Sequence, residues 1–296
     1  MALEMFLQAV GITLLAPLLQ GFIQWCKARL QNRRGPSPLQ PYRNLFKLLA
    51  KDMVVAGTAS WISFITPFVC FGAAIAVAAL LPVVSSGWGV SDLFLIVYLF
   101  GLSRFLLALA GLDSGNSFAG MGSSREMYLA VLVEPAFLLA IVATAGAVGT
   151  TELGRMVQHA TAHSFTLPYV LAAGAFFIVV IAESGRIPVD KPETHLELTM
   201  FQEAMLIEYS GRQLALLLWS VYVRQLAMVV LFVELFFPWH WFDLIPSLFV
   251  WGMLKIFLVG FLLALTETST AKMRLFRLPN FLAASGLLAL LALVAS

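Results

Sequence analysis

The segment from residue 181 to residue 211 has side chains that could hold and transfer protons. Apolar residues such as Phe201 and Leu206 alternate with its acids, which favours burial of the segment over full exposure. Carboxylates buried near one another titrate as a coupled group, and some of their pKa values are raised. The segment therefore predicts proton exchange, although a solvated acidic loop has a similar composition. Its six carboxylates are Glu183, Asp190, Glu193, Glu197, Glu203 and Glu208.

A helix is expected to begin at the second proline of this segment. Pro192 suits the first position of a helix through Glu193, His195 and Glu197, because a first helical residue leaves its N–H unpaired and proline has none. Glu193 and Glu197 are four residues apart and share one face of such a helix. The spacing therefore predicts one acidic pair.

The segment from residue 26 to residue 52 is basic and complements the acidic one. Arg33 and Arg34 precede a Gly-Pro turn, and residues 42–52 have the pattern of an amphipathic helix lying at a membrane surface. Two interpretations stay open for this loop. Its charges orient the protein and contact lipid headgroups, or they dock an acidic or cofactor-bearing soluble partner. The cations of the loop are Lys27, Arg29, Arg33, Arg34, Arg43, Lys47 and Lys51.

These loops must be positioned by membrane-spanning helices. The 296 residues are 60% hydrophobic and 11% charged, whereas soluble domains are about 25% charged. A bilayer core needs about 20 apolar residues per helix. We therefore expect an all-α polytopic membrane protein, with residues 1–296 in one domain and a structured loop between helices five and six. The eight expected spans are 3–25, 61–84, 92–111, 127–149, 166–184, 213–237, 245–266 and 279–295.

The cations also predict the orientation of the chain. Of 18 Lys and Arg residues, 14 lie in alternate loops, and only Arg155 lies in an opposite loop. Because Lys and Arg accumulate in cytoplasmic loops, the basic face is predicted to be cytoplasmic. Both termini are then on the outer side of the inner membrane, and segment 181–211 is cytoplasmic.

Two carboxylates and a proline lie at the start of the fourth expected span or within it. A charge in the hydrocarbon region costs about 2.5–3.5 kcal/mol on insertion scales, so each needs a reason. Glu126 and Glu134 are eight residues apart, which is about 12 Å along a helix. Pro135 is expected to kink this helix and to free backbone groups for water. A polar path or a hydrogen bond to a neighbouring span would account for Glu134.

Three cations are also expected within spans. Lys255 lies about ten residues from either end of its span and needs a carboxylate partner or a lowered pKa. Arg224 is a second candidate for proton transfer. Arg104 either has a function or extends toward the cytoplasm, and Glu234 is expected to reach the outer interface.

The remaining reactive residue types predict no redox centre in this chain. Cys26 and Cys70 form no CxxC pattern, so no iron–sulfur cluster is expected. His159 and His163 have i, i+4 spacing without a third ligand, so no metal site is expected. We expect no catalytic residue and no nucleic-acid partner.

Both cytoplasmic loops resemble those of the subunit 1 family of complex I, the proton-translocating NADH:quinone oxidoreductase. The first-loop pattern is Arg33-Arg34-Gly35-Pro36, Leu39-Gln40, Lys47-Leu48 and Lys51. The acidic-loop pattern is Glu183, Arg186, Pro188, Asp190, Glu193, His195, Glu197 and Glu208-Tyr209-Ser210-Gly211. The runs GLDSG (111–115) and SSRE…VLVEP (123–135) resemble the formate hydrogenlyase subunit 4 and hydrogenase-4 component C branch. His195 replaces a family Glu, and the segment before Glu208 is about three residues longer than in the better-known members.

The resemblance implies a coupling subunit that docks a soluble redox arm and links electron transfer to proton translocation. The implied partners are a nickel–iron hydrogenase-like large subunit, an iron–sulfur small subunit, antiporter-like membrane subunits and the lipid bilayer. The expected proton path is Glu126, Glu134, Glu183, Asp190, Glu193, Glu197, Arg224 and Lys255. The expected docking residues are Arg33, Arg34, Gly35, Pro36, Arg43, Lys47, Asp113, Arg125, Arg186, Glu208 and Tyr209.

Two alternatives stay open. In the first, the chain belongs to a quinone-reactive complex, and its first and third loops frame a quinone headgroup at the partner interface. In the second, the chain is a stand-alone ion transporter, which its lack of an internal repeat disfavours. The sequence leaves undetermined whether the partner binds nickel, which electron donor serves it, and whether H⁺ or Na⁺ is moved.

Overall fold

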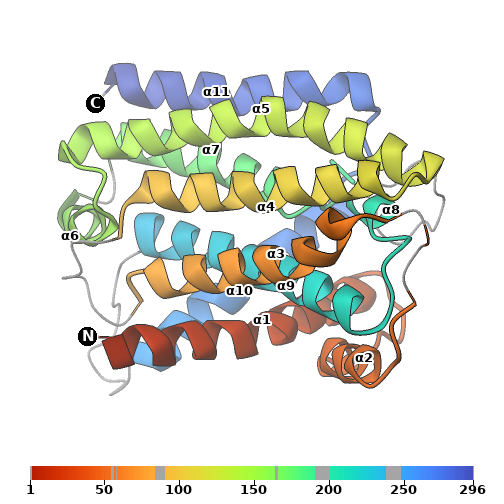
Figure 1. Cartoon of the computed structure of the whole chain (residues 1–296). Coiled ribbons are helices and arrows are strands. Elements are labelled where there is room, and N and C mark those ends of the chain that lie inside the picture. The colour runs from red at the N-terminus through yellow and green to blue at the C-terminus, as the bar shows by residue number, and fades with distance from the viewer. Residues whose placement is uncertain are drawn as a thin grey trace.

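Long helices run side by side along the length of the molecule in the computed structural model (Figure 1). The described residues are 2–54, 57, 59–83, 91–163, 166–190, 201–237 and 248–295. Within them the long helices are α1 (Ala2–Leu30), α3 (Trp61–Leu80), α4 (Leu93–Asp113), α5 (Ser117–Val148), α7 (Leu167–Glu183), α9 (Gly211–Phe236), α10 (Leu248–Ser269) and α11 (Leu278–Ala295). The expected all-α polytopic fold is confirmed.

The long helices correspond to the eight expected spans. Among the described residues, seven are long and apolar enough to cross a membrane, and α7 is a shorter apolar helix of 17 residues. One boundary differs clearly, because α5 begins at Ser117 instead of residue 127. The side chain of Asn116 accepts a hydrogen bond from Phe118 N at 2.9 Å and caps this early start. Glu126 is therefore well inside α5.

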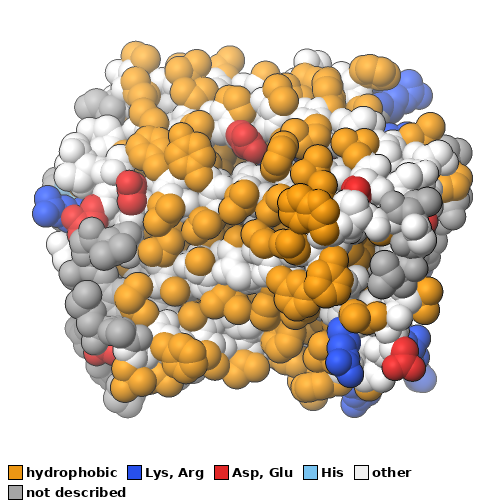
Figure 2. All heavy atoms as spheres, in the orientation of Figure 1, with side chains coloured by type: hydrophobic (Ala, Val, Ile, Leu, Met, Phe, Trp, Pro, Cys, Tyr) orange, Lys and Arg blue, Asp and Glu red, His pale blue; other side chains and the backbone are white. Residues whose placement is uncertain are grey.

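Short helices lie at the two ends of the bundle. The helices α2 (Gln40–Leu49) and α8 (Gln202–Met205) are at one end, which we call the basic end (Figure 1). Helix α6 (Leu153–His163) and both chain termini are at the other end. Figure 2 shows an apolar belt between the two ends, with most of the visible Lys and Arg side chains at the basic end. A 3-10 helix, η2 (Leu275–Arg277), connects α10 to α11.

The expected amphipathic helix in the first loop is confirmed as α2. Its residues Pro41 and Leu45 are buried, and the helix contacts α1 and α9. Arg43 and Lys47 are exposed on its other side. The helix thus fixes its apolar face on the bundle and presents cations at the basic end.

Helix α9 lies at the centre of the packing. It contacts α1, α2, α3, α7 and α10, and most of its residues are buried. Phe232 packs against Phe176 and Phe177 of α7, with ring centroids 6.2 and 5.6 Å apart. Polar residues of this helix, among them Arg224 and Gln225, are therefore buried as well.

Candidate functional site

The guanidinium of Arg104 on α4 lies among three carboxylates. Its Nε is 3.1 Å from Oε1 of Glu126 and its Nη1 is 3.8 Å from Oε1 of Glu134, both on α5. Its Nη2 donates a hydrogen bond to Oε2 of Glu183, the last residue of α7. We call these four residues the Arg104 cluster. With all its groups ionised, one cation faces three anions.

Burial makes this charge imbalance significant. The side chains of Arg104 and Glu183 are each 5% exposed and that of Glu126 is 10% exposed, whereas that of Glu134 is 45% exposed. Buried charge without compensation is costly, and here three carboxylates share one cation. Arg224 on α9 adds a second buried cation whose charge acts on Glu126. The chemistry that this arrangement supports is proton exchange among coupled carboxylates.

Sequence analysis left Arg104 open between a function and extension toward the cytoplasm. The structure answers this, since Arg104 is inside the bundle and only 4% exposed. Its partners are 22, 30 and 79 residues away along the chain. The sequence showed an unpaired cation and three carboxylates in neighbouring spans. It did not show that they contact one another, because that depends on how the helices pack.

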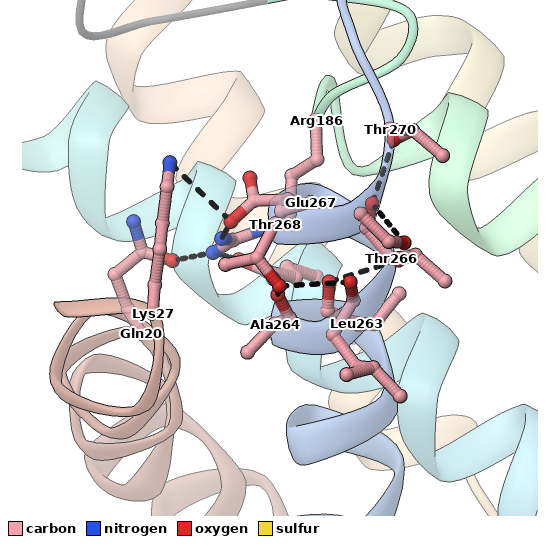
Figure 3. Close-up of polar contacts among 12 residues, drawn as sticks. Gln20, Lys27, Arg186, Leu263, Ala264, Thr266, Glu267, Thr268 and Thr270 are labelled. Atoms are coloured by element: carbon pink, nitrogen blue, oxygen red, sulfur yellow. Dashed lines mark hydrogen bonds and ion pairs between the residues drawn. The ribbon is translucent and has the colours of Figure 1, made fainter. Parts of the chain in front are cut away.

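A second buried polar cluster lies between α1, α9, α10 and the turn after α7 (Figure 3). Nη1 of Arg186 is 3.3 Å from Oε2 of Glu267. Its Nη2 donates to Oε1 of Gln20 and, at 3.1 Å, to Oε1 of Gln225. Nζ of Lys27 lies 3.6 Å from the same oxygen of Glu267. We call these five residues the Arg186 cluster, in which two cations share one carboxylate.

The Arg186 cluster corrects one expectation and adds residues that sequence analysis missed. Arg186 was expected at the docking surface, but it is 7% exposed and holds helices together instead. Glu267 and Lys27 are 4% and 7% exposed and were not predicted as a pair. The sequence contained a hint of this pair. Glu267 follows the apolar part of α10 and Lys27 follows that of α1, so a carboxylate and a cation lie at the ends of two apolar spans.

A short turn joins the two clusters. Glu183 and Arg186 are three residues apart, and Gly185 between them has a φ of +59°. Such a conformation is readily adopted only by glycine. The turn directs Glu183 toward α4 and Arg186 toward α1 and α10, so one segment contacts a cluster with excess negative charge and a cluster with excess positive charge.

The loop after this turn is held by the connection between α10 and α11. Asp190 is 3% exposed, and its Oδ1 is 3.0 Å from Nζ of Lys272. Its Oδ2 accepts a hydrogen bond from Phe201 N at 3.1 Å. Met273 N donates to the carbonyl of Pro188 at 2.9 Å. Asp190 therefore fixes the loop, whereas Glu193, His195 and Glu197 lie outside the described residues.

Glu208 and Tyr209 connect the loops at the basic end. Oε1 of Glu208 accepts a hydrogen bond from Nδ2 of Asn116 at 2.5 Å. The hydroxyl of Tyr209 donates to the carbonyl of Ser63 at 2.9 Å. Burial raises the pKa of Tyr209 to about 12, so its phenol remains a donor near neutral pH. Tyr209 was expected to dock a partner, but it is 8% exposed and supports the loops from inside.

Ser210 and Gly211 complete this connection. The hydroxyl of Ser210 accepts a hydrogen bond from Val54 N at 2.7 Å and donates to Val54 O at 2.8 Å. Gly211 has a φ of +53°, and a Cβ built there lies 2.5 Å from the carbonyl oxygen of Asp52. This position therefore requires glycine both for its backbone conformation and for its close approach to the first loop.

Most other expected docking residues are at the surface of the basic end. Arg33, Arg34, Pro36, Arg43 and Lys47 are exposed, and Gly35 and Arg125 are partly exposed. Asp113 has a structural role, because its Oδ2 accepts hydrogen bonds from Ser60 N at 2.9 Å and Ser63 Oγ at 2.7 Å.

The structure does not bring Lys255 into the Arg104 cluster. Lys255 is 14 residues before the end of α10, whereas Arg104 is nine residues before the end of α4. At about 1.5 Å per residue these positions are about 21 and 14 Å from the basic end. The charge of Lys255 acts instead on Glu234 of α9. Glu234 is only partly exposed and faces this cation across the α9–α10 contact.

Comparisons with known proteins agree with this architecture. Residues 3–296 match the model of the family described as NADH dehydrogenase. The chain is 36% identical over 279 residues to formate hydrogenlyase subunit 4 of Escherichia coli (strain K12), covering 91% of this chain and 90% of that protein. It is 38% identical over 279 residues to hydrogenase-4 component C of the same organism, covering 90% and 87%.

A third protein is similar in sequence, and a solved structure is similar in fold. The chain is 30% identical over 265 residues to the H-type subunit of the NADH-quinone oxidoreductase of Anaplasma phagocytophilum (strain HZ), covering 79% of this chain and 77% of that protein. A chain of the membrane-bound sulfane sulfur reductase, an archaeal respiratory membrane complex, superposes with a TM-score of 0.85 at 22% identity, covering 99% of this chain and 100% of the other. The protein therefore belongs to the NADH dehydrogenase family, the subunit 1 family of complex I, as its loop motifs predicted.

Proposed function

We propose that this chain is the membrane coupling subunit of an energy-converting hydrogenase or a hydrogenase-related complex. It docks a soluble redox arm at its basic end and links electron transfer to proton translocation. The named relatives, which include subunits of formate hydrogenlyase and hydrogenase-4, support the class of complex. The observation that carries the coupling role is the Arg104 cluster, in which a residue beside the acidic loop and two residues of a membrane helix share one cation.

Docking uses the exposed cations of the basic end. Arg33, Arg34, Arg43 and Lys47 project from the first loop and α2. Cations of this kind steer and orient an acidic partner more than they add affinity. The partners in this proposal are a hydrogenase-like large subunit and an iron–sulfur small subunit, which contain the nickel–iron and iron–sulfur centres. The basic end then faces the cytoplasm, and both termini are outside the inner membrane.

Coupling acts through the segment that joins the two clusters. A charge change in the docked partner, or in the acidic loop with Glu193 and Glu197, changes how often Asp190 and Glu183 carry a proton. When Glu183 is protonated, Arg104 is released to pair more closely with Glu126 and Glu134. The proton occupancy of Glu126 and Glu134 in α5 thereby depends on whether Glu183 carries a proton. The two neighbouring sites are then coupled. Arg224 supports this exchange from α9, and Lys255 with Glu234 forms a separate station nearer the other end.

Glu134 provides an exit from the Arg104 cluster. Its side chain is 45% exposed, although it lies on a membrane helix. A carboxylate facing lipid costs about 2.5–3.5 kcal/mol, which favours a neighbouring membrane subunit over lipid at this position. In the proposal that neighbour is an antiporter-like subunit that receives the proton.

The proposal is tested by Glu183→Gln in the assembled complex. Membrane vesicles are assayed for electron transfer and for proton translocation together. We expect electron transfer to continue while translocation per electron falls, because Gln cannot exchange a proton with Arg104's other partners. Glu152→Gln, at the end of the molecule opposite the basic end, is the matched control and is expected to leave both activities unchanged. Full translocation in Glu183→Gln would rule out the coupling role.

A quinone-reactive complex is the second candidate, because one relative is a subunit of an NADH-quinone oxidoreductase. In that case the first and third loops frame a quinone headgroup at the partner interface. Assays of the purified complex for nickel and for bound quinone separate the two candidates. A stand-alone ion transporter would instead migrate alone or as a small homo-oligomer after mild detergent extraction.

A further inference from the structure

A cavity of about 340 Å³ lies at the end of the molecule opposite the basic end. Its walls come from α5, α6 and α7, with one residue each from α9 and α11. Apolar side chains such as Val148, Met156 and Ala172 form most of the lining, and His159 and Tyr169 are among its few polar groups. Ligand pockets in proteins typically have volumes of about 300–1,000 Å³ and similar mixed linings.

Helix α6 closes one side of this cavity and is amphipathic. Leu153, Met156 and Ala160 are buried toward the bundle, whereas Arg155 is exposed. Figure 1 shows α6 nearly end-on while the long helices run across the view. A short amphipathic helix with this orientation lies in the plane of a membrane interface. The cavity is therefore at the depth where acyl chains meet their headgroups.

Two basic residues of α6 stand beside the cavity. Arg155 and His159 are four residues apart and share one face of the helix, and His159 lines the cavity. The side chain of Arg155 is 66% exposed, and its Nε is 2.8 Å from Oε2 of Glu152. This ion pair holds the guanidinium against the helix while other N–H donors remain for a ligand. An arginine in this position is suited to a phosphate group.

We propose that the cavity binds one acyl chain of a membrane phospholipid, whose phosphate is held by Arg155 and His159. The apolar lining matches the chain, and the N–H donors of Arg155 and His159 match the phosphate of the headgroup. This site lies at the other end of the molecule from the docking loops, so it is separate from the Arg104 cluster and from a quinone framed by the first and third loops. The bound lipid fixes α6 against α5 and α7.

The probe is a phosphatidylglycerol with a diazirine on its acyl chain, added to the purified membrane complex and activated by light. We expect labelled peptides from α6 and α7, including those that contain Met156 and Ala172. Ala172→Trp fills the cavity and is expected to lower this labelling about tenfold. Val170→Trp is the matched control, because Val170 is 54% exposed on the same helix and does not line the cavity. Its labelling is expected to equal that of the unchanged protein.

A second pair of measurements identifies the headgroup contact. Arg155→Gln combined with His159→Gln removes both proposed phosphate contacts and is expected to lower labelling by phosphatidylglycerol by at least about tenfold, since loss of the charge-assisted hydrogen bond to Arg155 alone accounts for that factor. A diazirine-labelled isoprenoid without phosphate is expected to label the same peptides weakly and without regard to these substitutions. Equal labelling by both probes, or labelling that persists in Ala172→Trp, would overturn the proposal. The first outcome would assign the cavity to an apolar tail alone, and the second would place the lipid elsewhere.

Discussion

Nε of Arg104 on α4 and Oε1 of Glu126 on α5 are 3.1 Å apart inside the membrane-spanning bundle. The same guanidinium binds Glu183 at the start of the acidic loop. A carboxylate of the loop and a carboxylate of a spanning helix therefore compete for one cation. Protonating either one strengthens the pairing of the other, which gives a physical basis for coupling without large movement of the backbone.

Replacing Arg104 by Gln is expected to destabilise the protein strongly. The change leaves Glu126 and Glu183 buried without their cation, and breaking a buried ion pair from one side costs about 3–5 kcal/mol. The midpoint of unfolding in mixed detergent micelles measures this loss. Arg104→Lys keeps the charge and is expected to lose less, because only the guanidinium geometry is changed. Equal midpoints for Arg104→Gln and the unchanged protein would show that the cluster contributes nothing to stability.

Glu134→Gln is expected to lower proton translocation while leaving the stability of the protein nearly unchanged. The carboxylate of Glu134 is 3.8 Å from Arg104 and partly exposed on a membrane helix, where a neutral amide is less costly than a charge, so Glu134→Gln is expected to lose little stability. If Glu134 is the exit of the proton path, the same variant loses most proton translocation in vesicles while electron transfer continues. A stable variant with undiminished translocation would place the exit elsewhere. Tyr128→Phe, on the same helix, controls for general disturbance of the exposed face.

Sequence analysis predicted the helices well because the signal for a membrane helix is local. Each span needs only enough consecutive apolar residues, and eight such segments were visible. The start of α5 was missed because most of residues 117–126 are small or polar and continue the helix beyond its apolar part. The signal there was the cap at Asn116, which a hydropathy pattern ignores.

The candidate site was predicted only in part, because its contacts are not local. Glu126, Glu134, Glu183 and Arg104 were each identified as ionisable groups in or beside spans, but Arg104 was not predicted to be the common partner of the three carboxylates. The family resemblance placed residues of the loop motifs at a docking surface. Arg186 and Tyr209 are instead buried, where other side chains and a backbone carbonyl satisfy their hydrogen bonds.

Glu267 is expected to hold the Arg186 cluster together. Glu267→Gln leaves Arg186 and Lys27 as neighbouring cations without their shared carboxylate, and we expect a loss of about 3–5 kcal/mol. Adding Lys27→Met removes one of these charges and should restore part of the stability. Unfolding of both single variants and of the double variant gives the coupling energy. Purely additive losses would mean that the two side chains do not interact.

Tyr209 predicts a dependence of stability on alkaline pH. Burial raises its pKa from 10.0 to about 12, so the unfolded chain loses this proton first as the pH rises. The contribution of Tyr209 is complete below about pH 10 and is lost between about pH 10 and pH 12. Tyr209→Phe should remove this fall in stability between about pH 10 and pH 12. It should also cost about 1 kcal/mol at neutral pH, because the hydrogen bond to Ser63 is lost. Unfolding midpoints of both proteins across this range measure the difference, and parallel curves would contradict it.

Gly211 is expected to tolerate alanine less well than another glycine of the same conformation. Both Gly211 and Gly149 have positive φ angles, +53° and +74°, so alanine at either position adds backbone strain of about 1–3 kcal/mol. At Gly149 a Cβ meets nothing within 4 Å, whereas at Gly211 it lies 2.5 Å from the carbonyl oxygen of Asp52. Gly211→Ala must therefore also push the first loop away from α9. We expect the larger loss of stability there, together with faster proteolysis of residues 50–54. Equal losses in the two variants would show that conformation alone selects glycine at position 211.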